Sequence, residues 1–203
     1  MKILLATNNK DKIKEIKYLL KEYEIYTIDD ILFSCDEIIE NGLSFKENAL
    51  IKSRAIFSKL NEKQKKEFIV LSDDSGISVK ALNNAPGIYS ARFSKEKTTQ
   101  ANRAKLIKEL KNKNIKQSPA FYTACIGLSS YFGDFVIHGF MYGKVIDIEK
   151  GQNGFGYDSL FVPKGFEQTL GELDDDTKAT ISHRYKAIKL IKILLDFFIS
   201  KIE

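Results

Sequence analysis

The residues most able to do chemistry are two adjacent carboxylates, Asp73 and Asp74, in the run SDDSG. They follow the apolar residues 68–71, which predict a buried strand. An acidic pair at the end of such a strand is costly unless it is solvated or bound, and α/β sheets place ligands at this end of their strands. Neighbouring strand side chains point to opposite faces, so we expect one carboxylate to enter a cleft, where it could bind a hard cation or deprotonate a water. Ser75 and Gly76 would let a hydroxyl and backbone approach a phosphate, and an acidic capping turn is the alternative.

A second candidate is the loop TNNKDK, which follows an apolar strand and opens a predicted helix. Its members are Thr7, Asn8, Asn9, Lys10, Asp11 and Lys12. Backbone N–H groups at a helix N-terminus favour an anion, and Lys12 could meet a phosphate as a point charge. We expect left-handed backbone at Asn8 and Asn9 to curl the loop. The loop lacks the glycines of a Walker motif, and taken alone it is better interpreted as an asparagine-rich cap with surface lysines.

Glu40, Glu47 and Lys52 come from the loop and predicted helix before the acidic strand. If that helix packs beside the strand that ends at Asp74, a second carboxylate completes a sparse oxygen site. One or two carboxylates, with water and substrate phosphates, are the usual ligands of Mg²⁺. The sequence leaves open whether Glu40 or Glu47 would be the second ligand.

The run GFGYD places an aromatic pair and a carboxylate on a glycine-containing turn. Phe155 or Tyr157 could stack on a planar base, and Asp158 could accept a hydrogen bond from a ring N–H. The alternative is a turn plugged by its aromatic side chains and capped by the aspartate. Donors suited to a keto oxygen or a phosphate follow at Lys178 and at His183 and Arg184, the last two near the start of an amphipathic helix.

The elements that position these residues alternate between strands and helices. Strands are predicted at 3–6, 25–28, 68–71 and twice within 120–148, with a turn near 133–134. Helices are predicted from Ile13 onward, at 45–60, at 99–111 and over the last apolar stripe. That stripe comprises Ala187, Leu190, Ile191, Leu194, Leu195 and Phe198. The pattern predicts an α/β fold with two lobes on one mixed sheet.

Composition excludes several classes of protein. The chain has 203 residues, 43% of them hydrophobic, with 12 Gly and 3 Pro, which excludes disordered and fibrous proteins. Its two cysteines, Cys35 and Cys125, match no metal or disulfide pattern, so a reducing cytoplasm is expected. No targeting or membrane-spanning segment is predicted.

The net charge of +5 arises locally, since residues 95–116 carry eight basic side chains against two acidic ones. That segment has no aromatic side chain to stack bases, so it is interpreted as a solvated helix face rather than a stable nucleic-acid site.

Six blocks together resemble the non-canonical purine nucleoside triphosphate pyrophosphatases, the inosine or xanthosine triphosphate pyrophosphatase family. The blocks are LLATNNKDKIKEI, ENGLSFKENALIKS, LSDDSGI, NNAPGIYSARFS, GFGYDSLF and KATISHR. They run in the family's order from one end of the chain to the other. The resemblance implies one domain over 1–203, an elongated mixed β-sheet flanked by helices, whose two lobes enclose a nucleotide cleft. It also implies a homodimer and Mg²⁺-dependent hydrolysis of ITP, dITP and XTP to the monophosphate and pyrophosphate.

The resemblance assigns roles to the candidate residues by motif. Asp74 would be the general base and a metal ligand, with Glu40 the second ligand and Glu47 its alternative. Phosphate contacts would come from Thr7 to Lys12, Lys52 and Ser75. The base would stack on Phe155, in a pocket shaped by Gly156, Tyr157 and Asp158, and its edge would meet Lys178, His183 and Arg184.

Two positions depart from the family pattern, and two other functions are alternatives. Asn8 stands where Gly or Ser is common, and Ser159 stands where Pro is usual. A Maf-like pyrophosphatase for modified pyrimidine nucleotides is one alternative, against which GFGYD and SHR argue. The other is a non-catalytic nucleotide- or RNA-binding module that uses residues 95–116. Within the favoured function, we expect guanine to be rejected by a pocket with no partner for its 2-amino group.

Overall fold

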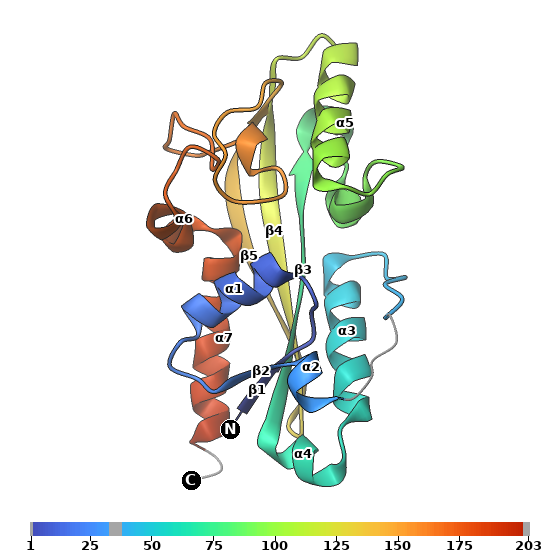
Figure 1. The fold of residues 1–203 in the computed structure, drawn as a ribbon, viewed down its shortest axis with the longest axis vertical. Helices are drawn as coiled ribbons and strands as arrows, with labels where there is room; N and C mark the ends of the chain where they lie inside the picture. The colour runs from blue at the N-terminus through green and yellow to red at the C-terminus, as the bar shows by residue number, and fades with distance from the viewer. Residues whose placement is uncertain (1, 33–37, 201–203) are drawn as a thin grey trace. The chain divides into compact units, whose positions relative to one another are not determined.

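The structure is a computed structural model that describes residues 2–32 and 38–200 (Figure 1). Cys35 and two acidic residues of the loop before Glu40, Asp36 and Glu37, lie outside the described residues. Inferences from the sequence about these three residues therefore stay predictions.

Six strands form one mixed sheet in the order β2-β1-β3-β4-β5-β6. The strands are β1 (Lys2–Leu5), β2 (Ile25–Thr27), β3 (Phe68–Val79), β4 (Gln117–Ser130), β5 (Gly133–Ile146) and β6 (Phe161–Pro163). The helices are α1 (Lys10–Leu19), α2 (Ile28–Ile31), α3 (Phe45–Lys59), α4 (Glu62–Glu67), α5 (Thr99–Asn112), α6 (Asp175–Ile181) and α7 (His183–Ile199). Strand β1 pairs in parallel with β2 and β3, whereas β5 and β6 are antiparallel. The predicted α/β class with a mixed sheet is confirmed.

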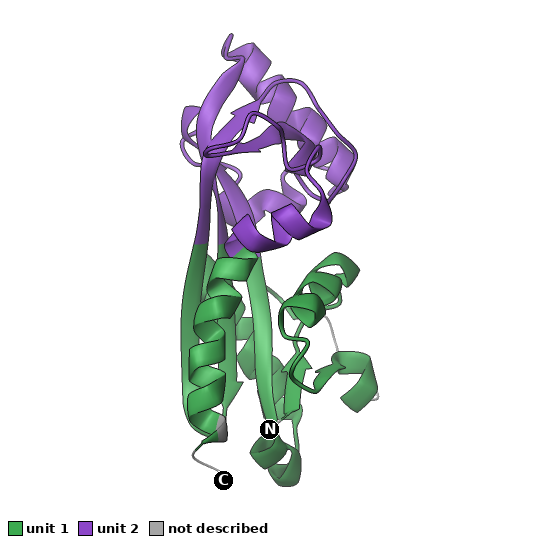
Figure 2. Ribbon diagram, turned by 90° about the vertical axis from the view of Figure 1, so that its left-hand side faces the viewer, with its two compact units in different colours: residues 1–74, 124–139, 184–203 green, residues 75–123, 140–183 purple. Residues whose placement is uncertain are grey.

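The chain divides into two compact units, and β3, β4 and β5 contribute to both (Figure 2). Unit 1 comprises residues 1–74, 124–139 and 184–203, and unit 2 comprises residues 75–123 and 140–183. The boundary in β3 falls between Asp74 and Ser75.

Unit 1 has a cluster of buried side chains on each face of its sheet. Helices α1 and α7 cover one face, where alternate residues of β1 and β3 such as Leu5 and Leu71 are buried. Helix α3 covers the other face, where Leu4, Val70 and Ile56 are buried. Each fully buried aliphatic side chain contributes about 1.5–3 kcal/mol relative to exposure. The two clusters explain why residues 3–6 form a continuous apolar run.

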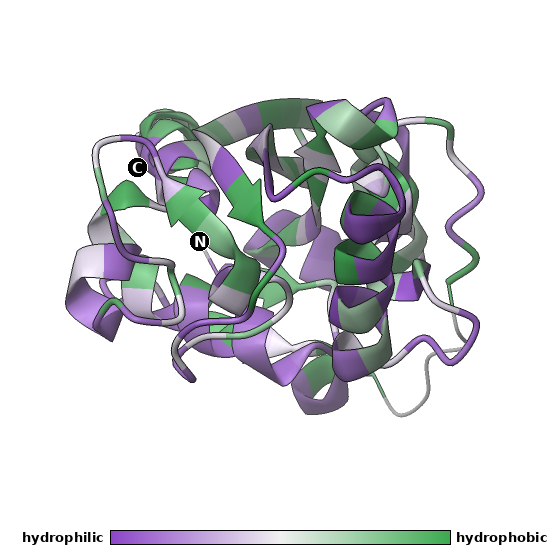
Figure 3. Cartoon of the chain, turned by 90° about the horizontal axis from the view of Figure 1, so that it is seen from above, coloured by the Kyte–Doolittle hydropathy of each residue, from purple (hydrophilic) through white to green (hydrophobic). Residues whose placement is uncertain are grey.

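Unit 2 has its own core. Strands β3 and β4 contribute Val79 and Tyr122, α5 contributes Leu106 and Leu110, and β6 contributes Phe161. Helices throughout the chain carry hydrophobic residues beside hydrophilic ones (Figure 3), as expected for helices that bury one face only. None of the described helices is long and apolar enough to cross a bilayer.

Three expectations from the sequence are corrected by the structure. Strand β3 does not end before the acidic pair but continues through it to Val79. Among the described residues, the non-glycine positive φ angles belong to Asn83, Asn84, Lys97 and Asn114, so the left-handed prediction for the asparagines of TNNKDK is wrong. In α7, Leu190 is 46% exposed, whereas Ile188, which the predicted stripe omitted, is 1% exposed and packs in the core of unit 1.

Candidate functional site

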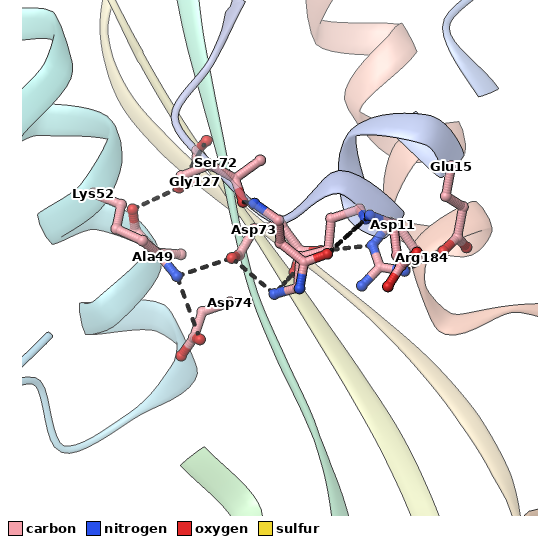
Figure 4. Close-up of polar contacts among 12 residues, drawn as sticks. Asp11, Glu15, Ala49, Lys52, Ser72, Asp73, Asp74, Gly127 and Arg184 are labelled. Atoms are coloured by element: carbon pink, nitrogen blue, oxygen red, sulfur yellow. Dashed lines mark hydrogen bonds and ion pairs between the residues drawn. The ribbon is translucent and has the colours of Figure 1, made fainter. Parts of the chain in front are cut away.

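Asp73 lies at the centre of a buried ion-pair cluster in unit 1 (Figure 4). Its Oδ2 accepts a hydrogen bond from Nε of Arg184 at 2.5 Å, and its Oδ1 lies 3.6 Å from the ammonium of Lys12. The Arg184 side chain is 1% exposed, and its Nη1 also pairs with Glu15. Burial alone would raise the pKa of Asp73, but the charges of Arg184 and Lys12 outweigh burial and hold it well below its usual value. Asp73 is therefore a structural carboxylate that joins β3 to α1 and α7.

Asp74 points toward α3, whereas Asp73 points toward α1 and α7, as the strand alternation predicts. Its Oδ1 lies 3.5 Å from Nζ of Lys52 on α3, and the same ammonium donates to Oε2 of Glu40 at 3.1 Å and to the Asp73 carbonyl at 2.9 Å. Burial raises the pKa of Asp74, and the nearby Lys52 and Lys12 only partly offset that effect. A carboxylate with a raised pKa beside two cations is suited to take a proton from a water.

The residues around Asp74 fit a hard cation. Its Oδ2 is buried and accepts no hydrogen bond from any residue in the described ranges. Glu40, whose side chain is 28% exposed, shares Lys52 with Asp74, so two carboxylates converge on one ammonium. Glu47 instead accepts a hydrogen bond from the Leu43 N–H at 2.6 Å and closes the start of α3. This geometry favours Glu40 over Glu47 as the second ligand. Residues 2–32 and 38–200 contain no cluster of three or more His, Cys, Asp or Glu placed to hold a metal ion.

Helix α3 reaches this position because its backbone packs directly on the sheet. The Ser72 hydroxyl donates to the Ala49 carbonyl at 2.6 Å, one turn before Lys52. Gly127 on β4 leaves room for this contact, since a Cβ there would lie 2.7 Å from Ser72 Oγ and 2.8 Å from the Ala49 carbonyl oxygen. Figure 4 shows Ser72, Gly127 and Ala49 close together. We infer that the small residues at 72 and 127 set the distance between α3 and β3.

We expect Gly127→Ala to lower the free energy of unfolding by about 1–3 kcal/mol, because the new methyl group meets backbone atoms that cannot rotate away. Urea unfolding of the purified variant measures this loss. An unchanged unfolding midpoint would mean that α3 shifts freely and that Gly127 does not determine its position.

The loop TNNKDK is organised by its own side chains. Asn9 caps α1, and its Oδ1 accepts hydrogen bonds from the N–H groups of Asp11 and Lys12 at 3.0 and 3.1 Å. The Thr7 hydroxyl accepts from the Asn9 N–H at 3.2 Å. The predicted asparagine cap is therefore present. The backbone N–H of Lys12 belongs to this cap, and its side-chain Nζ donates to the Asp73 carbonyl at 3.3 Å. Asn8 and Lys10 are exposed.

The GFGYD turn in unit 2 is built around Asp158. Its Oδ2 pairs with Nζ of Lys178 and accepts from the Phe155 N–H at 3.0 Å, and its Oδ1 accepts from the Tyr122 hydroxyl at 3.3 Å. Gly154 has a φ of +77°, and a Cβ there would collide with the Asp158 carboxylate and the Lys178 ammonium. The glycine is therefore needed both for its backbone conformation and for space.

The two aromatic residues of the turn have different environments. Phe155 is half-buried, and the ammonium of Lys178 lies 5.0 Å from its ring centroid. Tyr157 is 4% exposed, and its hydroxyl donates to the Ser90 carbonyl at 2.8 Å. Phe155 is thus the better candidate to stack on a base, whereas Tyr157 packs in the core of unit 2. Gly156, between them, has a φ of +62°.

Sequence reasoning missed Tyr122, which contacts two of the predicted base-binding residues. Its ring stacks on that of His183 with centroids 4.7 Å apart and an interplanar angle of 14°. Its hydroxyl reaches Asp158, as described above. The signal was weak, because a tyrosine in an alternating strand is typical of an ordinary core residue.

Ser159, one of the two departures from the family pattern, takes part in a hydrogen-bond network with Glu149 and Arg103. Its hydroxyl donates to Oε2 of Glu149 at 3.0 Å, and the same oxygen accepts from Nε of Arg103 at 2.8 Å. Arg103 also donates to the Gly156 carbonyl at 3.3 Å. This network of side chains therefore restrains the GFGYD turn at a position where a proline is usual in the family.

The remaining predicted residues are placed as follows. Ser75 is half-buried on β3, beside Asp74 in the chain. Arg184 belongs to the cluster at Asp73, so its predicted contact with the edge of the base stays a prediction. Within α5, Lys105 and Arg103 bond to residues of unit 2, so only part of the basic segment is a solvated face. Cys125 is buried, which raises the pKa of its thiol to about 12 and makes it an unreactive core residue.

Comparison with known proteins matches residues 3–193 to the Ham1 family. A dITP/XTP pyrophosphatase of Campylobacter jejuni is 58% identical over 195 residues, which cover 96% of this chain and 97% of that protein. A dITP/XTP pyrophosphatase of Sulfurimonas denitrificans is 50% identical over 197 residues, with 96% and 98% covered. Among solved structures, the Ham1 protein of Staphylococcus aureus has a TM-score of 0.83 at 35% identity and covers 97% of this chain and 98% of that one.

Proposed function

Because the chain belongs to the Ham1 family, we propose that it is a nucleoside triphosphate pyrophosphatase that hydrolyses dITP, ITP and XTP to the monophosphate and pyrophosphate. Relatives at 58% and 50% identity carry the name dITP/XTP pyrophosphatase. The single observation in the site that best supports the proposal is Asp74, a buried carboxylate with one oxygen unengaged among the described residues and two lysines nearby. The reaction would remove non-canonical purine nucleotides from the nucleotide pool.

The proposed phosphate-binding residues belong to the TNNKDK loop, to α3 and to β3. We assign the triphosphate to residues 7–12, Lys52 and Ser75. Lys12 and Lys52 already lie together at the Asp73 carbonyl, and the two ammonium groups would neutralise negative charge that builds on the phosphates in the transition state. The hydrogen bonds to the Asp73 carbonyl hold the Lys12 and Lys52 side chains in position to contact the phosphates.

Asp74 would orient the attacking water and accept its proton at the carboxylate. Burial, which raises its pKa, brings the group closer to the pH at which a carboxylate base is effective. Glu40 and Asp74 would hold a divalent cation, for which Mg²⁺ is our choice because the ligands are sparse and all oxygen. When bound, the cation would lower the pKa of a coordinated water and neutralise phosphate charge. Lys52, shared by both carboxylates, would then donate to a phosphate oxygen.

Base recognition is assigned to the turn around Asp158. Hypoxanthine and xanthine present a 6-oxo acceptor and an N1–H donor, whereas adenine reverses this pattern. Phe155 would stack on the base, and Lys178 and His183 would donate to its keto oxygen. Adenine would meet these donors with its own 6-amino donor, so discrimination against it is expected to be large. Because the Arg184 guanidinium is engaged by Asp73 and Glu15, we favour a structural role for it.

We further propose that residues 1–203 act as one domain, as a homodimer, in the cytoplasm. Strands β3, β4 and β5 contribute to both units, which supports a single domain. The exposed Phe197 of α7 is a candidate residue of the dimer surface, whereas Ile188 is buried in the core of unit 1.

Release of pyrophosphate from dITP, XTP, dGTP and dATP, with and without Mg²⁺, tests the proposal. We expect Mg²⁺-dependent turnover of dITP and XTP and little turnover of dATP, because its base reverses the donor and acceptor pattern. Slow turnover of dGTP is expected if nothing pairs with its 2-amino group.

Equal turnover of all four nucleotides would keep the phosphate chemistry and discard the base assignment. Mg²⁺-independent binding that falls steeply with salt, without turnover, would instead favour the nucleotide- or RNA-binding alternative. Turnover confined to modified pyrimidine nucleotides would favour the Maf-like alternative.

A further inference from the structure

We propose that Tyr122 is a positioning residue for base recognition, which acts by holding Asp158 and the ring of His183 in place. The inference rests on the function proposed above and adds a residue that none of the recognised blocks contains. All the contacts that support it lie within unit 2.

The ring of Tyr122, on β4, is fixed by its neighbours on β6 and α7. It is 7% exposed, stacks on His183, and meets the edge of Phe161 with centroids 4.9 Å apart and an interplanar angle of 64°. A phenylalanine would make the same ring contacts, so packing alone does not require a hydroxyl here. A buried hydroxyl is costly unless it has a partner.

The partner of that hydroxyl is Asp158 Oδ1, at 3.3 Å. The other carboxylate oxygen, Oδ2, binds Lys178 and the Phe155 N–H. Tyr122 thus donates to one carboxylate oxygen while Lys178 and the Phe155 N–H bind the other. The Tyr122 bond restrains rotation of the carboxylate about the Cβ–Cγ bond of Asp158. Since Lys178 and Phe155 both bind the same carboxylate, its rotation would disturb the donor to the base and the stacking ring together.

Electrostatics keep the hydroxyl a donor. Burial and the negative charge of Asp158 raise the pKa of Tyr122 well above its usual value. The proton therefore stays on the phenol oxygen throughout the pH range used in enzyme assays. The stacking contact carries the restraint to His183, whose ring lies nearly parallel to that of Tyr122. One side chain therefore contacts two predicted base-binding residues from different segments of the chain.

The decisive variant is Tyr122→Phe, which removes the hydroxyl and keeps the ring. We expect the KM for dITP to rise on the order of tenfold while kcat stays within about twofold, because a lost bond to a charged group loosens base binding rather than the phosphate chemistry. The preference for dITP over dATP should fall as well, because the donors that contact the keto oxygen lose their fixed position. Tyr142→Phe is the matched control, since it makes the same change on a 58% exposed side chain of β5.

A double-mutant cycle tests whether Tyr122 acts through Asp158. In the Asp158→Ala background, which removes the acceptor, adding Tyr122→Phe should change the KM for dITP little further, because the two changes remove one interaction. Fully additive effects would overturn the role, as would Tyr122→Phe kinetics equal to those of Tyr142→Phe in an active enzyme. A wild type that hydrolyses none of the nucleotides would instead overturn the proposed function itself.

Discussion

Arg184→Met is expected to lower the free energy of unfolding by about 3–5 kcal/mol. The guanidinium it removes is 1% exposed and pairs with Asp73 and Glu15. Without it, the buried Asp73 carboxylate loses its hydrogen-bonded cation and keeps the weaker influence of Lys12 at 3.6 Å and of Lys52. A buried charge that loses its main partner destabilises the fold. Methionine fills much of the same volume, so the loss reflects charge more than packing.

The matched control for this variant is Arg54→Met. Arg54 also pairs with an aspartate, Asp134, at 2.7 Å, but its side chain is 58% exposed. Exposed ion pairs contribute at most about 1 kcal/mol, so this variant should unfold close to the wild type. Urea unfolding of both variants measures the difference, and equal losses would show that the cluster at Asp73 is not a structural anchor.

The acid dependence of stability provides an independent check on the same cluster. The pKa of Asp73 is depressed in the folded protein, so its contribution to stability is fully present above the unfolded pKa. It is lost progressively as pH falls from the unfolded pKa through the lower folded pKa. In Arg184→Met the depression should be smaller, and the wild type should therefore lose its advantage over the variant at acidic pH.

The role of Arg184 illustrates what sequence reasoning cannot reach. Its two carboxylate partners lie 111 and 169 residues away in the chain, and no local pattern joins them. Periodicity predicted α7 itself, because a helix that buries one face repeats its apolar residues every three to four positions. It misplaced Leu190 and omitted Ile188, since the width and centre of the buried face depend on which strands lie beneath it.

The end of β3 shows a second limit. The run SDDSG has the composition of a turn, so the strand was predicted to stop before it, whereas the structure continues it to Val79. Strand propensity is weak compared with tertiary context, and here the ion pairs of Asp73 and Asp74 compensate the charged residues inside the sheet. The site blocks were recognisable as ordered motifs, but Tyr122 was not, because its importance arises from Asp158 and His183 and not from its own neighbours.

Asp74→Asn is expected to reduce kcat for dITP by a factor of about 10²–10⁴, the usual contribution of a positioned general base. The amide keeps the shape of the side chain but cannot accept the proton of a water. The KM should change less, because Lys12 and Lys52 remain to bind phosphate. Asp134→Asn is the matched control, an aspartate of unit 1 that bonds to Ser129 and Arg54 instead.

The two neighbouring aspartates are expected to affect the free energy of unfolding in opposite directions, starting with Asp74. Its pKa is raised in the fold, so its ionised form is disfavoured there and costs stability as pH rises through the range between the unfolded and folded values. In buffer free of divalent cations, Asp74→Asn should therefore unfold at the same or a higher urea concentration than the wild type. Asp73→Asn should unfold at a lower one, because its charge is stabilised by Arg184 and Lys12. A variant that is as stable as the wild type yet inactive would mark Asp74 as a group kept for chemistry, whereas retention of more than a tenth of the wild-type kcat would remove it as the base.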